Sequence, residues 1–72
     1  KYSIKYEGGE RIFNNDHKDM WYKTKKSARE GALFFANKKN KNVIITKGGN
    51  RARVYPNGNI ELIKGEDIFD WL

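Results

Sequence analysis

Residues 42–64 contain three short apolar stretches separated by two tight-turn signals, and this spacing constrains the fold more than any other feature of the chain. Gly48-Gly49 provides a two-residue hairpin loop, and Pro56-Asn57-Gly58 suits a type I turn with Gly58 in the left-handed conformation. The two turns therefore predict an antiparallel meander of three strands. We expect these strands over residues 43–46, 51–55 and 59–63.

The two loops also fix which residues face each other across the meander. The predicted pairs are Val43 with Val54, Ile45 with Ala52, Val54 with Ile60, and Ala52 with Leu62. One face is then uniformly apolar and carries Val43, Ile45, Ala52, Val54, Ile60 and Leu62. The other face carries Ile44, Thr46, Arg51, Arg53, Tyr55, Glu61 and Ile63, with Arg53 opposite Glu61. Two independent turns thus agree on one consistently apolar face, which supports the prediction of a three-stranded meander.

The N-terminal third of the chain is predicted to form strands. Tyr2, Ile4 and Tyr6 alternate with polar residues at strand period, and Gly8-Gly9 then suggests a hairpin into residues 10–14. Residues 14–19 form a polar stretch that is typical of a loop. Residues 20–23 suit a further short strand, whose register the sequence leaves open.

Residues 24–39 are predicted to form the main helix. Thr24 is a suitable N-cap, and Ser27 with Glu30 offers an alternative capping box. Phe34 lies off the apolar face, so it is expected either to pack under the N-terminal loop or the C-terminal tail, or to contact a partner. The apolar face itself consists mostly of small residues, which allow close approach to a sheet: Ala28, Gly31, Ala32, Phe35 and Ala36.

The last seven residues combine acids with large apolar side chains, which predicts a short helical turn folded back on the sheet. The apolar residues are Ile68, Phe69, Trp71 and Leu72. With 72 residues, the chain is too short for two domains. We therefore expect one α+β domain over residues 1–72, in which a small antiparallel sheet packs on one main helix. The sheet comprises an N-terminal hairpin and the three-stranded C-terminal meander, and a short C-terminal helical turn completes the fold.

The chain is strongly basic, with 15 Lys and Arg residues, 9 Asp and Glu residues and a net charge of +6. Residues 24–53 hold nine of the cations but only one acid, Glu30, whereas residues 54–72 are acidic. Such asymmetry favours an anionic partner. The alternative is a Lys-rich and Asn-rich composition inherited from an A+T-rich genome, with lysines that only solvate the surface.

Several classes of function lack the residues that they need. The chain has no Cys, which excludes disulfides, thiolate metal sites and a Cys nucleophile. No apolar run approaches the roughly 18 residues of a membrane span, and no leader is visible, so we expect a cytoplasmic protein without membrane contact. His17 is the single His and lies in a polar loop beside acids. We expect it to be solvated rather than a general base or metal ligand, and we predict no metal, no cofactor and no enzymatic activity; a small nuclease using His17 is a minor alternative.

A first candidate site lies at the start of the predicted helix, where Lys25, Lys26 and Arg29 cluster. The unpaired N–H groups and the positive dipole end there already favour phosphate. Three cations at this end are unfavourable for the helix itself, so helix stability does not explain them. The cluster therefore indicates phosphate binding.

A second group of candidate residues follows the meander. Lys47, Arg51 and Arg53 add positive charge, and Tyr55 is predicted to share a strand face with both arginines. Cations beside an aromatic ring suit a strand that stacks bases while phosphates are neutralised. The alternatives are that Arg53 only pairs with Glu61 and that Tyr55 packs against Trp71.

The stretch Lys25-Lys26-Ser27-Ala28-Arg29 resembles the Lys-Lys-x-Ala-Lys start of the last helix in double-stranded-RNA-binding domains. In that family these cations grip phosphates across a groove, so the resemblance implies the same role here. No first helix is expected in this chain, and three strands follow the helix where that domain ends. The resemblance therefore implies a shared phosphate-gripping device rather than membership of the family.

These observations predict a small, non-catalytic nucleic-acid-binding protein that prefers RNA to DNA. It would grip phosphates with the cations at the helix start and on the sheet face. The alternative is a phage-type or mobile-element inhibitor or regulator that binds a host protein through the acidic tail, or through exposed Phe34 and Trp71.

Overall fold

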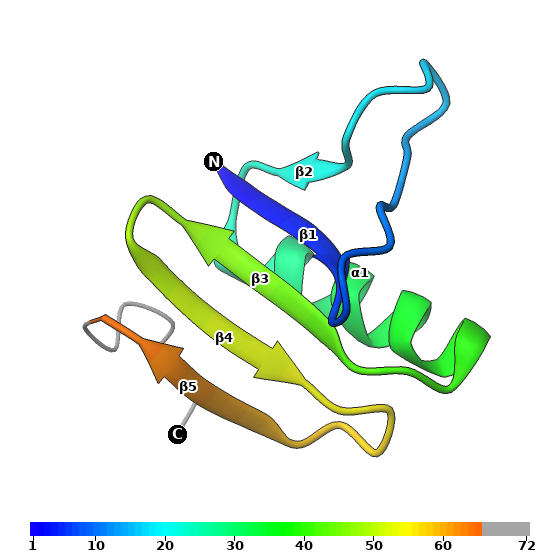
Figure 1. The fold of residues 1–72 in the computed structure, drawn as a ribbon. Helices are drawn as coiled ribbons and strands as arrows, with labels where there is room; N and C mark the ends of the chain where they lie inside the picture. Colours follow the sequence, from blue (N-terminus) through cyan, green and yellow to red (C-terminus); the bar gives the residue numbers. More distant parts are fainter. Residues whose placement is uncertain (66–72) are drawn as a thin grey trace.

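The computed structural model describes residues 1–65 and shows one helix packed against one face of a five-stranded sheet (Figure 1). The strands lie in the order β2-β1-β3-β4-β5, and all neighbours are antiparallel. The predicted α+β architecture is confirmed, while the predicted C-terminal turn at residues 66–72 lies outside the described residues. The elements are β1 (Tyr2–Tyr6), β2 (Trp21–Tyr22), α1 (Lys25–Lys39), β3 (Val43–Lys47), β4 (Asn50–Val54) and β5 (Ile60–Lys64).

The C-terminal meander has the register that its two turns predict. The observed pairs include Val43 with Val54, Ile45 with Ala52, Ala52 with Leu62, and Val54 with Ile60. Gly48 and Gly58 have φ angles of 60° and 93°, which suits glycine in these turns. The β4–β5 pairing shifts between Arg51 and Ala52, so that Arg51 lies opposite Lys64.

The N-terminal half differs from the predicted simple hairpin. The chain turns at Gly8-Gly9 as expected, but residues 10–14 form no strand and contribute one bridge to β1, between Lys5 and Arg11. Ile12 is buried, and its carbonyl accepts a hydrogen bond from the Met20 amide (2.9 Å). Beyond Ile12 the chain therefore folds back, and the residues after it pair with the residues before Met20 rather than with β1. Residues 13–19 therefore form a projecting arm between Ile12 and Met20, which both pack in the core, and β2 lies beside β1 as its antiparallel neighbour.

Small residues allow α1 to lie directly on the sheet. Ala28, Ala32 and Ala36 have no exposed surface, and they cover the inner face of the sheet. The Thr24 hydroxyl oxygen accepts a hydrogen bond from the Ser27 amide (3.1 Å), so the helix begins with the predicted cap. Only residues 40–42 join α1 to β3. The two elements therefore run antiparallel, and the start of α1 lies at the C-terminal end of β3 (Figure 1).

Gly31 is required where Tyr22 lies across α1, since a Cβ atom there would be 2.0 Å from the Tyr22 hydroxyl oxygen. We expect Gly31→Ala to lower the free energy of unfolding by about 1–3 kcal/mol, because the ring must move. In a Tyr22→Ala background, where the ring is absent, Gly31→Ala should instead raise the free energy of unfolding by up to about 1 kcal/mol, because alanine has the higher helix propensity. Urea unfolding of the four proteins measures both effects. Equal destabilisation in both backgrounds would show that the ring contact does not explain the glycine.

The outer face of the sheet, opposite α1, carries no helix among residues 1–65 (Figure 1). Ile44 lies on this face as predicted, yet only 2% of its surface is exposed. Its cross-strand neighbours are Lys5 on β1 and Arg53 on β4. The long side chains around Ile44 therefore cover it in place of a second layer of secondary structure.

Candidate nucleic-acid interface

One end of the domain gathers cations from six segments of the chain. The starts of β1, α1 and β4 meet the ends of β2, β3 and β5 there, because neighbouring strands are antiparallel and α1 runs antiparallel to β3 (Figure 1). We call this region the basic end. Its cations are Lys1, Lys23, Lys25, Lys26, Arg29, Lys47, Arg51 and Lys64.

None of the cations of the basic end makes an ion pair with another residue of the described chain. The ion pairs within residues 1–65 lie elsewhere and join Arg11 to Asp19, Lys39 and Lys41 to Glu10, and Arg53 to Glu7 and Glu61. Four of the six acids in this range are thereby engaged away from the basic end. The positive potential of the basic end is thus left without local compensation from these acids.

The start of α1 contributes the densest part of this charge. Its first turn contains no acidic residue, and Lys26 and Arg29 are exposed while Lys25 is half-buried. A cation near this end typically costs a helix about 0.3–1 kcal/mol, because it opposes the helix dipole. The arrangement is therefore unfavourable for α1 alone and favourable for binding an anion.

Two aromatic contacts place lysines on both sides of the sheet at the basic end. Lys47 Nζ lies 4.4 Å from the centre of the Tyr2 ring, and Lys1 Nζ lies 5.2 Å from the centre of the Trp21 ring. Trp21 pairs with Ser3 on the outer face and is 46% exposed, whereas the next residue, Tyr22, contacts α1. Trp21 is thus an exposed aromatic ring beside the cations.

Trp21 is not among the predicted site residues, because the sequence leaves the register of residues 20–23 open. Trp21 and Tyr22 are adjacent in a strand, so their side chains face opposite sides of the sheet. Tyr22 faces α1 because it packs at Gly31, and this tertiary contact is not visible in the sequence.

The predicted site residues are divided between the two ends of the domain. Five of them lie at the basic end: Lys25, Lys26, Arg29, Lys47 and Arg51. Arg53 and Tyr55 lie further along β4 and beyond it, toward the other end. The structure therefore brings together the helix-start cations and part of the meander, but not its last two candidates.

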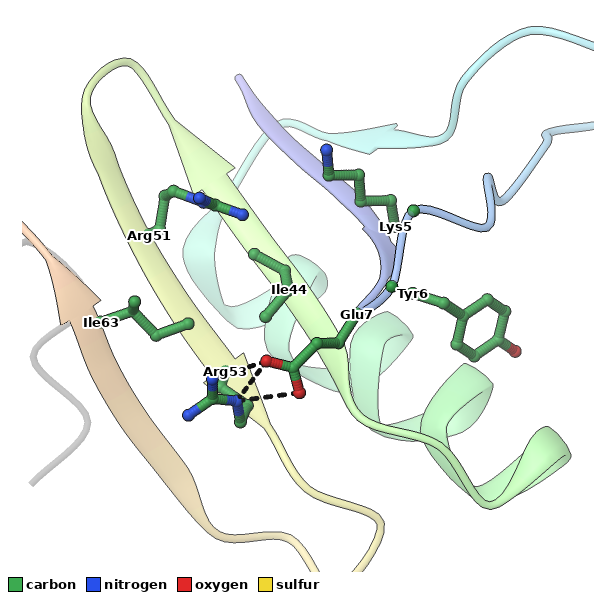
Figure 2. A pocket seen from close by; sticks show the side chains of 9 residues that line it. Lys5, Tyr6, Glu7, Ile44, Arg51, Arg53 and Ile63 are labelled. Atoms are coloured by element: carbon green, nitrogen blue, oxygen red, sulfur yellow. Dashed lines mark hydrogen bonds and ion pairs between the residues drawn. The ribbon is translucent and has the colours of Figure 1, made fainter.

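Arg53 is held by two carboxylates. Its Nε and Nη2 atoms donate to Glu7 at 2.6–3.0 Å (Figure 2), and its Nη1 atom donates to Glu61 at 2.5 Å. The Tyr55 hydroxyl also donates to Glu61 at 2.8 Å. The hydrogen bonds to Glu7 raise the pKa of Arg53 above its ordinary value, so the guanidinium is charged and already paired with carboxylates. The predicted alternative of an Arg53–Glu61 pair is present, together with a second partner, Glu7, far away in the sequence.

These contacts predict an acid-sensitive contribution to stability. Hydrogen bonds from Arg53 lower the pKa of Glu7 below its ordinary value of 4.5, and those from Tyr55 and Arg53 lower the pKa of Glu61. At a pH between the lowered pKa values of the folded protein and the ordinary pKa of about 4.5, the unfolded chain binds more protons than the folded protein. The stabilisation by these contacts is therefore complete above about pH 4.5 and is lost as the pH falls through the lowered pKa values. We expect the midpoint of thermal unfolding to fall over that range.

The Arg53→Gln variant should show a shallower loss of stability on acidification, because it removes the main cause of the lowered Glu7 pKa. Thermal unfolding between about pH 2 and pH 7 measures it. Arg51→Gln is the matched control, since Arg51 makes no ion pair within residues 1–65 and lowers the pKa of Glu7 much less than Arg53 does. Parallel pH curves for Arg53→Gln and the unmodified protein would contradict the assignment.

His17 lies in the exposed arm and adopts a positive φ of 60°. Within residues 1–65, no three His, Asp or Glu side chains are grouped so that they could hold a metal ion. In the same range, no helix is sufficiently long and apolar to cross a membrane.

Comparison of the chain with protein-family models, with curated proteins and with solved structures finds no significant match.

Proposed function

We propose that this protein is a non-catalytic nucleic-acid-binding protein that prefers RNA to DNA and binds through the basic end. The observation that carries the proposal is the charge separation along the domain. The cations of the basic end are free of ion pairs with described residues, whereas Glu7, Glu10 and Glu61 neutralise cations elsewhere. A polyanion would therefore be attracted to the basic end rather than to the opposite end of the domain, and the protein would approach it with the basic end first.

The start of α1 supplies the phosphate contacts in this proposal. Lys25, Lys26 and Arg29 would neutralise phosphates beside the positive end of the helix dipole. Lys47 and Lys64 extend the charge along the ends of β3 and β5. Release of the counterions condensed on the nucleic acid would then provide much of the binding free energy.

The preference for RNA rests on the combination of cations that make no ion pair with described residues and a sheet face that no helix covers within residues 1–65. Trp21 is exposed on that face, and an aromatic ring beside lysine can stack on an unpaired base. Proteins that recognise RNA commonly do so through unpaired bases in loops and single strands. Arg53 and Tyr55 would take no direct part, since both are bound to Glu61.

Phe34 supports a second candidate function, which is inhibition or regulation of another protein. It is 62% exposed on α1, more than any other large apolar residue in the described chain, and it packs edge-to-face on Phe35 with ring centres 5.2 Å apart. An exposed aromatic residue of this kind is typical of a protein-binding surface. Its place on α1 is separate from Trp21 on β2.

Equilibrium binding to fluorescent oligonucleotides at low salt tests the proposed function. The probes are single-stranded RNA, single-stranded DNA and an RNA duplex of the same length. We expect all three to bind, with single-stranded RNA the tightest. Absence of binding to every probe would reject the nucleic-acid function and leave the Phe34 surface as the better-supported candidate.

A further inference from the structure

The outer face of the sheet contains a hollow of about 220 Å³ (Figure 2). A single water needs only roughly 10–15 Å³ of such space, so the hollow can hold a ligand much larger than one water. The lining residues that bear on a ligand are Lys5, Glu7, Ile44, Arg51, Arg53 and Ile63.

The floor of the hollow is apolar. Ile44 lies at its base with 2% of its surface exposed, and Ile63 is 39% exposed beside it. A flat apolar ring placed over the floor would replace water mainly on the exposed surface of Ile63, and it would contact the small part of Ile44 that Lys5 and Arg53 leave uncovered. The floor therefore suits the face of a nucleobase better than a purely ionic ligand.

The charged rim is asymmetric. Figure 2 shows the Arg53–Glu7 pair on one side of Ile44, with Arg51 and Lys5 on the other. The Arg51 side chain is half-buried and makes neither an ion pair nor a side-chain hydrogen bond with any residue in the range 1–65, and Lys5 makes no ion pair there. One side of the hollow thus presents two available cations, and the other is already neutralised.

We propose that this hollow binds one nucleotide of a single strand, with its base over Ile44 and Ile63 and its phosphate between Lys5 and Arg51. The proposal rests on the proposed nucleic-acid function and narrows its ligand to unpaired strands, since a base held in a duplex cannot lie on the floor. Arg51 belongs to both the hollow and the basic end, so the neighbouring phosphates of the strand continue onto the basic end. A free nucleoside monophosphate carries the same chemistry, and the test separates the two sources.

The double variant Lys5→Gln/Arg51→Gln tests the phosphate side of the hollow. We expect it to bind a ten-nucleotide single-stranded RNA at least about tenfold more weakly, by the loss of two phosphate contacts. Its affinity for an RNA duplex of equal length should fall clearly less than its affinity for the single strand, because of the two replaced residues only Arg51 belongs to the basic end. The control is Lys18→Gln/Lys38→Gln, which removes the same charge from residues outside the hollow and the basic end. Thermal unfolding confirms that both variants are folded.

Methyl NMR spectra of the unmodified protein test the apolar floor. Single-stranded RNA is expected to shift the Ile44 and Ile63 methyl signals, and the RNA duplex is expected to leave them unchanged. Equal losses of single-strand and duplex affinity in the double variant, or unshifted Ile44 and Ile63 signals, would overturn the proposal.

The same spectra distinguish the source of the nucleotide. Saturable shifts with adenosine monophosphate in a protein that binds no RNA would overturn the strand assignment and leave a free-nucleotide site. If the protein binds duplex and single strand alike without shifts at Ile44, the hollow fails while the proposed function stands. If it binds neither RNA at low salt, the proposed function itself fails.

Discussion

Replacing Lys25, Lys26 and Arg29 with glutamine is expected to weaken RNA binding by on the order of 10–100-fold at near-physiological salt. The reason is the loss of three phosphate contacts and of the counterions that they release. None of the three side chains makes an ion pair or a side-chain hydrogen bond within residues 1–65. We call this protein the basic-end triple variant, and equilibrium binding to single-stranded RNA measures the effect.

The basic-end triple variant should be at least as stable as the unmodified protein. It removes cations from the positive end of α1, which should raise the free energy of unfolding by about 1 kcal/mol. For a domain of this size, that corresponds to roughly 4–8 °C in the midpoint of thermal unfolding. A variant that binds poorly but melts higher would show that the cations serve a ligand and not the fold.

The matched control replaces Lys38, Lys39 and Lys41 with glutamine and changes the net charge by the same amount. These residues lie at the end of α1 and just after it, where Lys39 and Lys41 pair with Glu10. We expect this control triple variant to keep most of its RNA affinity and to lose some stability. Equal losses of RNA affinity in both triple variants would mean that net charge, and not the basic end, governs binding.

Replacing Trp21 with alanine is expected to weaken binding to single-stranded RNA by about 1–3 kcal/mol, or roughly 5–150-fold. Trp21 is exposed on the outer face beside Lys1, so its ring is free to stack on a base. Trp21→Phe should restore part of the affinity, because a smaller ring can still stack. Competition binding against the unmodified protein measures the difference.

Phe34→Ala is the control for general loss of an exposed aromatic side chain. Phe34 is more exposed than Trp21 but lies on α1, away from the outer face. We expect its replacement to leave RNA affinity unchanged. If Phe34→Ala and Trp21→Ala weakened binding equally, specific stacking at Trp21 would be refuted.

The meander and the helix were predictable because their determinants are local. The loop after Lys47 has two residues and the turn at Gly58 has a glycine where positive φ is needed, so the register follows from chain geometry. The small residues of α1 likewise have a fixed spacing. The neighbour of β1 was not predictable in this way, because residues 7–20 separate β1 from β2 and no short turn sets the pairing.

The candidate site was only partly predictable for the same reason. The cluster at the start of α1 is visible in the sequence as neighbouring residues. The sequence does not show that Arg53 is ion-paired while Arg51 is not. This difference depends on Glu7, which is 46 residues from Arg53 and is brought beside it by the sheet. The outward orientation of Trp21 depends on Tyr22 packing at Gly31, which is also a tertiary contact.

The salt dependence of RNA affinity tests the basic end most directly. With about 4–6 phosphates neutralised, the logarithm of the association constant should fall linearly with the logarithm of salt concentration, with a slope of roughly −3 to −5. The slope of the basic-end triple variant should be shallower by about two, and that of the control triple variant should match the unmodified protein. A slope near zero for the unmodified protein, or the same slope in all three proteins, would contradict binding through the basic end.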